Sequence, residues 1–495
     1  MLKRSLARAS IPIIALGGAL ARVLGLGAQS FWYDEVVSRE VATGSLFGLL
    51  GRISTAEGSP PLYYIVLAIW GRVFGFSELA LRSFSALVGS VTVAVGVSAV
   101  HKWGFDRKAQ RSVALLLAFN PFLVWYSQEA RSYALLTLFG SLALLGLART
   151  QTQGSVRDFA LVGAALAGAV LTHYFAVFFA IGLLIVLGGT VERNRRLLYS
   201  LLPPIAAGTV LLPLAISQRA TGQQDWITEW SLNFRLDAAM RHLLLGPSIP
   251  WSWVVPFIAI TFVIATVPIF RIDEPRKRIA ARSLLVVGIC SIGIPMLLAT
   301  VGFDYFLDRN VVLGLIPLLM VAAIGIALYI QVLVRTCLAS VLVVFSIASV
   351  FAVVRDSDMQ RADYRSLAAT LDAGGRPDII SMNSGRVPMS ALRGYIDGHR
   401  EIGWGSTAYA QDVAFIGLDP VPGRCDWWYG RACSIVYLSA EPPQTMPHVF
   451  RLVGIDRVDR FVITRYHAEV PVALEPAFLI PPGDEIGSLV FELFD

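Results

Sequence analysis

The sequence predicts a polytopic α-helical membrane protein with about eleven spans, followed by a C-terminal extracytoplasmic α/β domain. Of its 495 residues, 55 % are apolar and only 15 % are charged, whereas a soluble chain carries roughly a quarter charged residues. The mean hydropathy is +0.64. Lys and Arg residues separate long uncharged runs, which is typical of an integral membrane protein. Because the net charge of +6 is distributed in this way, we expect no nucleic-acid partner.

Eleven segments are nearly free of charge and long enough to approach the length of about 20 residues that crosses a bilayer. They are 10–28, 83–100, 112–128, 132–148, 158–172, 173–191, 197–217, 251–270, 283–303, 310–330 and 336–354. The first has a basic start and also fits a cleaved signal peptide. Ten further spans behind it favour an uncleaved first helix.

The segment 61–75 is apolar but short, and it contains Arg72. If it lies in the membrane interface, every basic cluster falls on one side; if it spans, the later clusters change sides. These clusters begin at Lys3, Lys102, Arg149, Arg193, Arg271 and Arg335. The positive-inside rule therefore predicts a multi-pass membrane protein with a cytoplasmic N-terminus and an extracytoplasmic C-terminus. Segment 61–75 is then a helix lying along the outer surface.

This topology divides the chain into a membrane domain, residues 1–354, and an extracytoplasmic domain, residues 355–495. The outer loop 29–82 of the membrane domain carries surface helices. In the tail, charge rises and short strand-like runs alternate with helical stretches, which indicates a small α/β domain. The strand-like runs are 377–381, 434–438 and 460–464, and the helical stretches are 365–371 and 388–396.

The tail also contains Cys425 and Cys433, eight residues apart. Outside the cytoplasm they can close a disulfide loop, and two free thiols are the alternative. No Cys and His spacing in the chain resembles a zinc site, so no metal ligands are assigned.

The adjacent carboxylates Asp34 and Glu35 directly follow the first span and are flanked by aromatic residues. One interpretation is catalytic: a base beside an orienting or metal-binding group at the membrane surface. The other is structural: Asp34 is the N-cap of a helix from Glu35 to about Leu50, with Glu35 in its favourable first turn. The two interpretations are compatible, because a helix N-terminus also fixes the orientation of a carboxylate.

Further polar residues lie at successive outer turns. They are Glu129, Arg131, His173, Tyr174, Asp304, Tyr305 and Arg309. Each has an ordinary explanation, such as a solvated turn, an interfacial histidine, or an arginine that snorkels to the headgroups. Arg22, near the outer end of the first span, poses the same choice between snorkelling and phosphate binding. Their common location on the outer side predicts a pocket for a lipid-linked anionic substrate and an acceptor from outside.

Several segments together resemble bacterial GT-C glycosyltransferases of the family 39 type, relatives of protein O-mannosyltransferases and of lipid A aminoarabinose transferases. The segments are WYDE at 32–35, SPPLYY at 59–64, SELALRSFSAL at 77–87, NPFLVWYSQEARSYAL at 120–135, THYFAVFF at 172–179 and LDRNVVLGLIPLL at 307–319. The resemblance covers roughly residues 10–330, and the tail is not specific to it.

The resemblance implies an enzyme that takes a sugar from a polyprenyl phosphate at the outer leaflet and transfers it with inversion to a lipid, glycan or protein. It implies that Asp34 is the general base and that Glu35 completes the paired acidic motif. Arg309 lies near the position of a basic group that binds the donor phosphate, although Arg309-Asn310 replaces the usual Arg-Tyr. His173 stands where some relatives have a Lys, and Glu129 loosely matches a second acidic position.

The expected partners are a polyprenyl-phosphate-linked sugar, an extracytoplasmic acceptor and membrane lipid. No cofactor is required, and assistance by a divalent cation is left open because no second firm ligand accompanies the acidic pair. A lipid or sugar transporter or flippase without transferase chemistry is the alternative. Against it, the ionisable residues gather at outer turns rather than within spans, where coupled transport tends to place them. The sequence does not specify the sugar or the acceptor.

Overall fold

The computed structural model describes residues 2–191, 195–222, 224–382, 391–396, 398–402, 406–418, 447–475, 479 and 489–493. The chain forms two compact units. The helical unit comprises Met1–Leu26 and Ser38–Met359, and the sheet unit comprises Gly27–Val37 and Gln360–Asp495. In this grouping by contacts, residues 27–37 go with the C-terminal part of the chain and residues 355–359 with the helical part.

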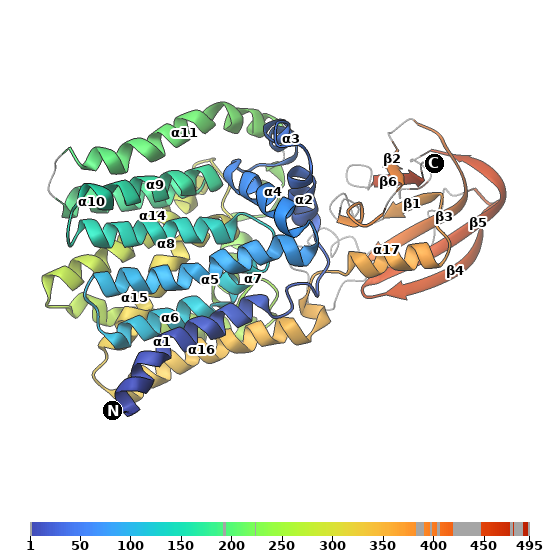
Figure 1. The fold of residues 1–495 in the computed structure, drawn as a ribbon. Coiled ribbons are helices and arrows are strands. Elements are labelled where there is room, and N and C mark those ends of the chain that lie inside the picture. The colour runs from blue at the N-terminus through green and yellow to red at the C-terminus, as the bar shows by residue number, and fades with distance from the viewer. Residues whose placement is uncertain are drawn as a thin grey trace. The chain divides into compact units, whose positions relative to one another are not determined.

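Long helices make up the helical unit (Figure 1). Those of the membrane domain are α1 (Leu2–Val23), α5 (Glu78–Lys102), α6 (Arg107–Phe119), α7 (Pro121–Ser127), α8 (Tyr133–Thr150), α9 (Val156–Thr172), α10 (Ala176–Thr190), α11 (Leu197–Ala220), α13 (Val255–Thr266), α14 (Pro275–Thr300), α15 (Val312–Leu328) and α16 (Val332–Arg355). The segment 29–82, which we call the first outer loop after its predicted side, forms α2 (Tyr33–Thr43), α3 (Leu49–Ala56) and α4 (Leu62–Phe74). The segment 218–250, called the second outer loop on the same prediction, forms the 3-10 turn η1 (Asp225–Glu229) and α12 (Leu232–Leu245).

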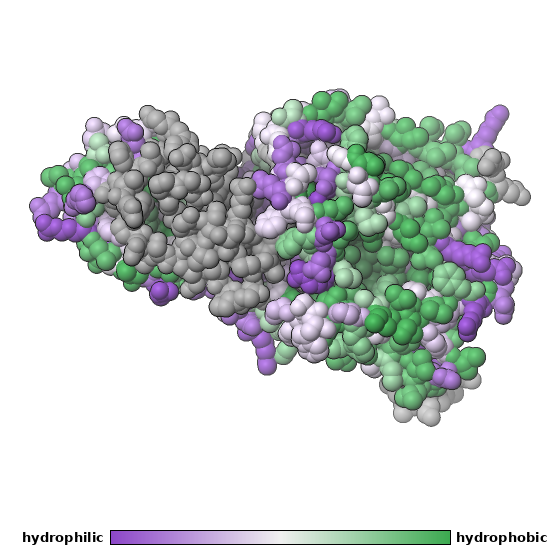
Figure 2. Space-filling view, turned by 180° about the vertical axis from the view of Figure 1, so that it is seen from behind, coloured by the Kyte–Doolittle hydropathy of each residue, from purple (hydrophilic) through white to green (hydrophobic). Residues whose placement is uncertain are grey.

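Every predicted span falls on a helical segment. Among the described residues, seven helices are long and apolar enough to cross a membrane: Glu78–Lys102, Tyr133–Thr150, Leu197–Ala220, Ser252–Arg271, Pro275–Thr300, Arg309–Leu328 and Val332–Arg355. Figure 2 shows a broad apolar surface on this unit, with hydrophilic residues gathered toward its ends. The count of eleven spans and the orientation stay predictions.

The predicted span 112–128 is broken into α6 and α7 at Asn120 and Pro121. Because Pro121 has no backbone N–H, the Leu117 carbonyl loses its helical donor. Arg22, only 1 % exposed, supplies the replacement: its guanidinium donates to the carbonyls of Leu117 at 3.0 Å and Ala118 at 2.7 Å. Arg22 therefore caps a broken helix, and neither snorkelling nor phosphate binding is needed to explain it.

Close helix contacts in this unit depend on glycine. A Cβ at Gly163 of α9 would lie 2.0 Å from the carbonyl oxygen of Tyr199 in α11, and one at Gly325 of α15 would lie 1.9 Å from that of Ala265 in α13. Small residues at such contacts let helix backbones approach each other, which supplies packing energy where lipid is as apolar as the side chains.

In the first outer loop, the predicted helix 35–50 is shorter, because α2 ends at Thr43 and glycine and serine residues follow. Arg52 and Arg72 donate to carbonyls at this end, namely those of Val41, Ala42, Gly44 and Ser45. The predicted helix at 61–75 is confirmed as α4. Arg72, which interrupts its apolar sequence, thus caps the neighbouring helix.

The sheet unit contains α17 (Tyr364–Ala373) and a six-stranded sheet in the order β2-β6-β1-β3-β5-β4. The strands are β1 (Ile379–Met382), β2 (His399–Glu401), β3 (Ala408–Leu418), β4 (Arg451–Val458), β5 (Phe461–Leu474) and β6 (Leu489–Leu493). β1 pairs with β3 in parallel, and the other pairs are antiparallel.

The sequence located β1, the start of β5, and α17 correctly. The strand predicted at 434–438, residues 388–390 and the pair Cys425 and Cys433 lie outside the described residues. α17 packs against one sheet face, where Tyr364 contacts Phe461 with 5.2 Å between ring centroids. Arg465 of β5 donates to the Thr370 and Leu371 carbonyls and so caps the end of α17.

Candidate active site

The acidic pair occupies the first turn of α2. The helix begins at Tyr33, one residue before Asp34, so Asp34 is not its N-cap. The N–H of Val36 donates to the Trp32 carbonyl at 3.0 Å, and the Trp32 N–H lies 3.5 Å from the Glu35 carboxylate, which reaches back over the helix start. Glu35 is fully buried, whereas Asp34 is partly exposed. Of the two carboxylates, Asp34 is therefore the one suited to meet a substrate.

Arg131 lies in a buried polar cluster of the helical unit. Its guanidinium forms a two-pronged ion pair with Glu57 and donates to the hydroxyls of Tyr64 at 3.1 Å and Ser38 at 3.2 Å. Arg131 is 7 % exposed and Glu57 5 %. Burial raises the pKa of the Tyr64 hydroxyl, so that group stays neutral. Arg131 thus joins α2, the residues before α4, and the turn after α7.

The outer turns of the helical unit bring several predicted residues together. Tyr126 lies within electrostatic range of Glu129, Asp308 and Arg309, and the charges of Arg131 and Arg309 reach the side chain of His173. We call Glu129, Arg131, His173, Asp308 and Arg309 the outer cluster. Glu129 is fully buried, so the solvated turn considered from the sequence is wrong at this position.

His173 lies in the turn between α9 and α10. Its Nδ1 accepts a hydrogen bond from the backbone N–H of Phe175 at 3.2 Å. A nitrogen that accepts carries no proton, so the imidazole is neutral and its Nε2 is the donor. His173 can therefore offer a hydrogen bond to an anion but no full charge.

Tyr174 and Gln218 connect the first outer loop to α11. The Tyr174 hydroxyl donates to the Gln218 side-chain oxygen at 2.7 Å. The Gln218 amide in turn donates to the carbonyls of Ile53 and Ser59 at 3.2 and 3.1 Å. Through this relay, Tyr174 helps to hold the loop that leads into α4.

Two buried pairs fix the segment before α15. Arg235 of α12 forms a two-pronged ion pair with Asp304 and also donates to the Phe306 carbonyl at 2.8 Å. His242 Nδ1 lies 2.7 Å from the Asp308 carboxylate, and both side chains are 2 % exposed. Hydrogen bonds from Arg235 lower the pKa of Asp304. The pair therefore stabilises the loop at neutral pH, and this contribution is lost as the pH falls through the pKa of Asp304.

Arg309 and Tyr305 each take part in a stacked contact. The Arg309 guanidinium lies 5.7 Å from the ring centroid of Trp226, and that of Arg219 lies 5.8 Å from the ring of Tyr305. An aromatic face holds a guanidinium in place and leaves its N–H donors at the edge for an anion. Arg219 at the end of α11 and Arg309 at the start of the 3-10 turn before α15 therefore each lie over an aromatic ring.

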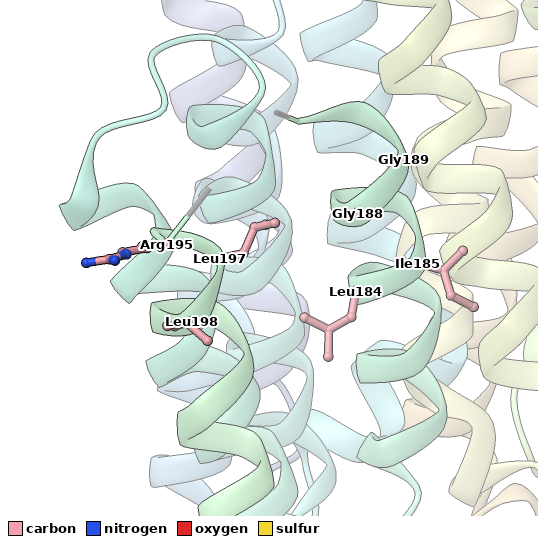
Figure 3. Close-up of a pocket in the computed structure, with 7 residues that line it drawn as sticks. All are labelled: Leu184, Ile185, Gly188, Gly189, Arg195, Leu197 and Leu198. Atoms are coloured by element: carbon pink, nitrogen blue, oxygen red, sulfur yellow. The ribbon is translucent and has the colours of Figure 1, made fainter. Parts of the chain in front are cut away.

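A hollow of about 810 Å³ lies elsewhere, between α10 and the start of α11. Leucine, isoleucine and glycine line it together with Arg195, which extends outward on the side away from α10 (Figure 3). It contains none of the predicted site residues, so it is not the candidate active site. Within the described part of the chain, no three His, Cys, Asp or Glu side chains come close enough to hold a metal ion.

The sequence did not single out Glu57, Arg235 or His242, which pair with predicted residues. Glu57 stands two residues before the quoted SPPLYY segment and is the C-cap residue of α3, a position that gave no signal of its buried partner. Arg235 and His242 lie seven residues apart in α12, on one face of that helix. Their partners are more than sixty residues away along the chain, and no local pattern identifies such a pairing.

Comparison with known proteins identifies the fold. Over 92 % of the chain, the fold matches 98 % of a crystal structure of ArnT from Cupriavidus metallidurans bound to undecaprenyl phosphate, with a TM-score of 0.55 and 13 % identity. The apo structure of the same protein matches with a TM-score of 0.56 and 14 % identity, over 94 % of this chain and 98 % of that one. The chain has the GT-C glycosyltransferase fold.

Residues 58–217 match the family model described as dolichyl-phosphate-mannose-protein mannosyltransferase. No curated protein matches the chain by sequence. The resemblance to GT-C glycosyltransferases predicted from the sequence is therefore confirmed. The matched residues carry α4 and the outer turns with Glu129, Arg131 and His173, whereas the acidic pair and Arg309 lie outside them.

The buried pair Arg131–Glu57 makes a stability prediction. Glu57→Gln and Arg131→Gln should each lower the free energy of unfolding by about 3–5 kcal/mol, because each leaves one uncompensated buried charge. The double variant should lose less than the sum of the two. Thermal unfolding of the purified full chain in detergent measures this. Asp237→Asn, which breaks the exposed pair with Arg241, is the matched control and should change stability by less than about 1 kcal/mol. Additive losses from Glu57 and Arg131 would contradict the pairing.

Proposed function

We propose that this protein is an inverting glycosyltransferase that moves a sugar from a polyprenyl-phosphate donor to a hydroxyl of an extracytoplasmic lipid, glycan or protein. The GT-C fold supports the transferase class. The ArnT structure of the same fold, bound to undecaprenyl phosphate, supports the donor class. The observation that carries the proposal is the partly exposed Asp34 beside the buried Glu35 in the first turn of α2.

In the proposed reaction, the Asp34 carboxylate accepts the proton of the acceptor hydroxyl. The hydroxyl oxygen attacks the anomeric carbon from the face opposite the phosphate. The bond between that carbon and the phosphate oxygen breaks, and its electron pair leaves with the polyprenyl phosphate. Such a leaving group needs cations and donors more than it needs a proton, so one base suffices if its oxygen comes within about 3 Å of the hydroxyl.

The phosphate is the proposed ligand of Arg309, whose plane Trp226 fixes, and His173 contributes a neutral donor. Tyr305 is the other proposed substrate contact. Glu129 was also predicted to bind substrate, but its side chain is fully buried, so no direct contact is proposed for it. Arg131, Tyr174 and Asp304 were also predicted to bind substrate. We propose that they act by holding the outer loops, because their polar atoms engage Glu57, Gln218 and Arg235. A divalent cation is not part of this proposal.

Asp34→Asn tests the base. The amide has nearly the same shape but cannot accept the proton, so transfer should fall at least about 100-fold while the melting temperature stays unchanged. The assay incubates purified full chain with a panel of labelled undecaprenyl-phosphate sugars and envelope extract, and it measures label transfer and release of undecaprenyl phosphate. Asp237→Asn, on the exposed face of α12, is the control and should behave as wild type.

Full activity of Asp34→Asn would remove Asp34 as the base. Movement of intact donor across vesicle membranes, without sugar release by the wild type, would instead identify a transporter.

Arg309→Ala tests the donor contact. The KM for the undecaprenyl-phosphate sugar should rise about tenfold or more, because a charge-assisted contact to phosphate is lost. The KM for the acceptor should change little. Arg241→Ala removes an arginine from the exposed i,i+4 pair on α12 and serves as the control. An unchanged donor KM in Arg309→Ala would contradict the phosphate role.

The proposed location is the bacterial inner membrane, with a cytoplasmic N-terminus and an extracytoplasmic C-terminal domain. In a chain whose four cysteines are replaced by serine, a single cysteine is placed at Lys108, Thr228 or Arg376, all exposed positions. A membrane-impermeant maleimide added to spheroplasts should label positions 228 and 376, and should label position 108 only after permeabilisation. The opposite pattern would reverse the topology.

A further inference from the structure

The segment that carries the acidic pair is part of the sheet unit. Residues 27–37 group with Gln360–Asp495 by their contacts. The Ser30 hydroxyl donates to the Ala362 carbonyl at 3.0 Å and accepts from the Tyr364 N–H at 3.0 Å. These two bonds fasten the chain just before α2 to the chain just before α17.

Side-chain packing continues this attachment into the first turn of α2. The Phe31 N–H donates to the Tyr395 hydroxyl, and Tyr33 packs against the core between α17 and the sheet. A Cβ at Gly394 would lie 2.8 Å from Val36 Cγ2. The turn that holds Gly394 therefore packs closely against α2 beside the acidic pair.

Arg361 connects this attachment to the acidic pair itself. Its guanidinium lies 3.4 Å from the Glu35 carboxylate and 5.2 Å from the ring centroid of Trp32. The Arg361 side chain is 12 % exposed and that of Glu35 is 0 % exposed. In addition, the Arg361 backbone N–H donates to the Gln29 side chain at 3.2 Å. Arg361 therefore contacts the segment at three successive points.

A buried carboxylate stays charged only where a cation or several donors face it. Glu35 is adjacent to Asp34 in the same helical turn, so a contact that fixes the backbone of this turn also fixes the direction of the Asp34 Cα–Cβ bond. Arg361 supplies a charge to Glu35 in this turn, a ring contact to Trp32 just before it, and a backbone hydrogen bond to Gln29.

We propose that Arg361 is a positioning residue for the glycosyl transfer. By pairing with Glu35 and stacking on Trp32, it fixes the first turn of α2 and thereby the position of the Asp34 carboxylate. The C-terminal unit thus supports the acidic motif directly. The expected effect of Arg361 on the transfer rate rests on the proposed function. Its expected effect on the order of residues 29–43 rests on the contacts alone.

The experiment compares Arg361→Ala, Arg361→Lys and Arg376→Ala in the purified full chain. Arg376 forms an exposed pair with Asp372 in the same unit and is the matched control. Release of undecaprenyl phosphate from whichever labelled undecaprenyl-phosphate sugar the wild type uses gives kcat and donor KM. Hydrogen–deuterium exchange is followed in a peptide covering residues 29–43 and in one covering α17.

In Arg361→Ala, kcat should fall about 10- to 100-fold, as misplacement of a reacting group by about 1 Å does, while the donor KM stays within about twofold. Exchange should rise in the 29–43 peptide and stay unchanged in α17. Arg361→Lys keeps the charge and should recover part of kcat. In a double-mutant cycle, Arg361→Gln added to Glu35→Gln should cost much less than it does alone.

Three results would overturn the proposal. The first is a wild-type kcat and wild-type exchange in Arg361→Ala. The second is faster exchange in α17 together with an equal loss of kcat in Arg361→Ala and Arg361→Lys, and the third is additive losses of kcat in the double-mutant cycle. A distinct result separates the two proposals. If Asp34→Asn retains full activity while Arg361→Ala still loosens the 29–43 peptide, the proposed function fails and the positioning contact stands.

Discussion

The outer loops of this protein depend on one constraint: a charge removed from water must meet an opposite charge or several hydrogen-bond partners. The structure satisfies this constraint with pairs in which at least one side chain is buried and which join segments far apart in the chain. They are Arg131–Glu57, Arg235–Asp304, His242–Asp308 and Arg361–Glu35. Such a pair gives less net stability than an apolar contact would, but it tolerates only one geometry. Each therefore fixes a loop where backbone alone would not.

That rigidity matters for the chemistry proposed here. Catalysis by a single carboxylate and a few phosphate donors depends on groups already held in the orientation that the transition state needs. The likeness to ArnT concerns the fold, whereas the particular pairs belong to this chain. Arg309 has a comparable partner, because its guanidinium lies over the ring of Trp226. Irregular segments can thus hold their side chains in a defined orientation, as helices do by themselves.

Particular elements show how far local pattern could predict this structure. Hydropathy located a helix at every predicted span, and period and length located α4, α17, β1 and the start of β5. The break at Pro121 and the early end of α2 after Thr43 were missed, although proline and a glycine-serine stretch mark both. For the site, the sequence named Asp34, Glu35, Arg131 and Arg309 as candidates, and Asp308 is the residue next to Arg309. It named none of Glu57, Arg235, His242 and Arg361.

By itself, the sequence determined the class of protein, the places of its helices and the kinds of side chain at its outer turns, because hydrophobic length and residue chemistry are properties of short segments. Tertiary structure alone decided which charges meet. It turned Arg22 into a cap for a helix broken nearly a hundred residues later, and joined Arg361 to Glu35 across 326 positions. The physical reason is that burial and partnership of a charge depend on segments brought together by packing, and no local pattern records them.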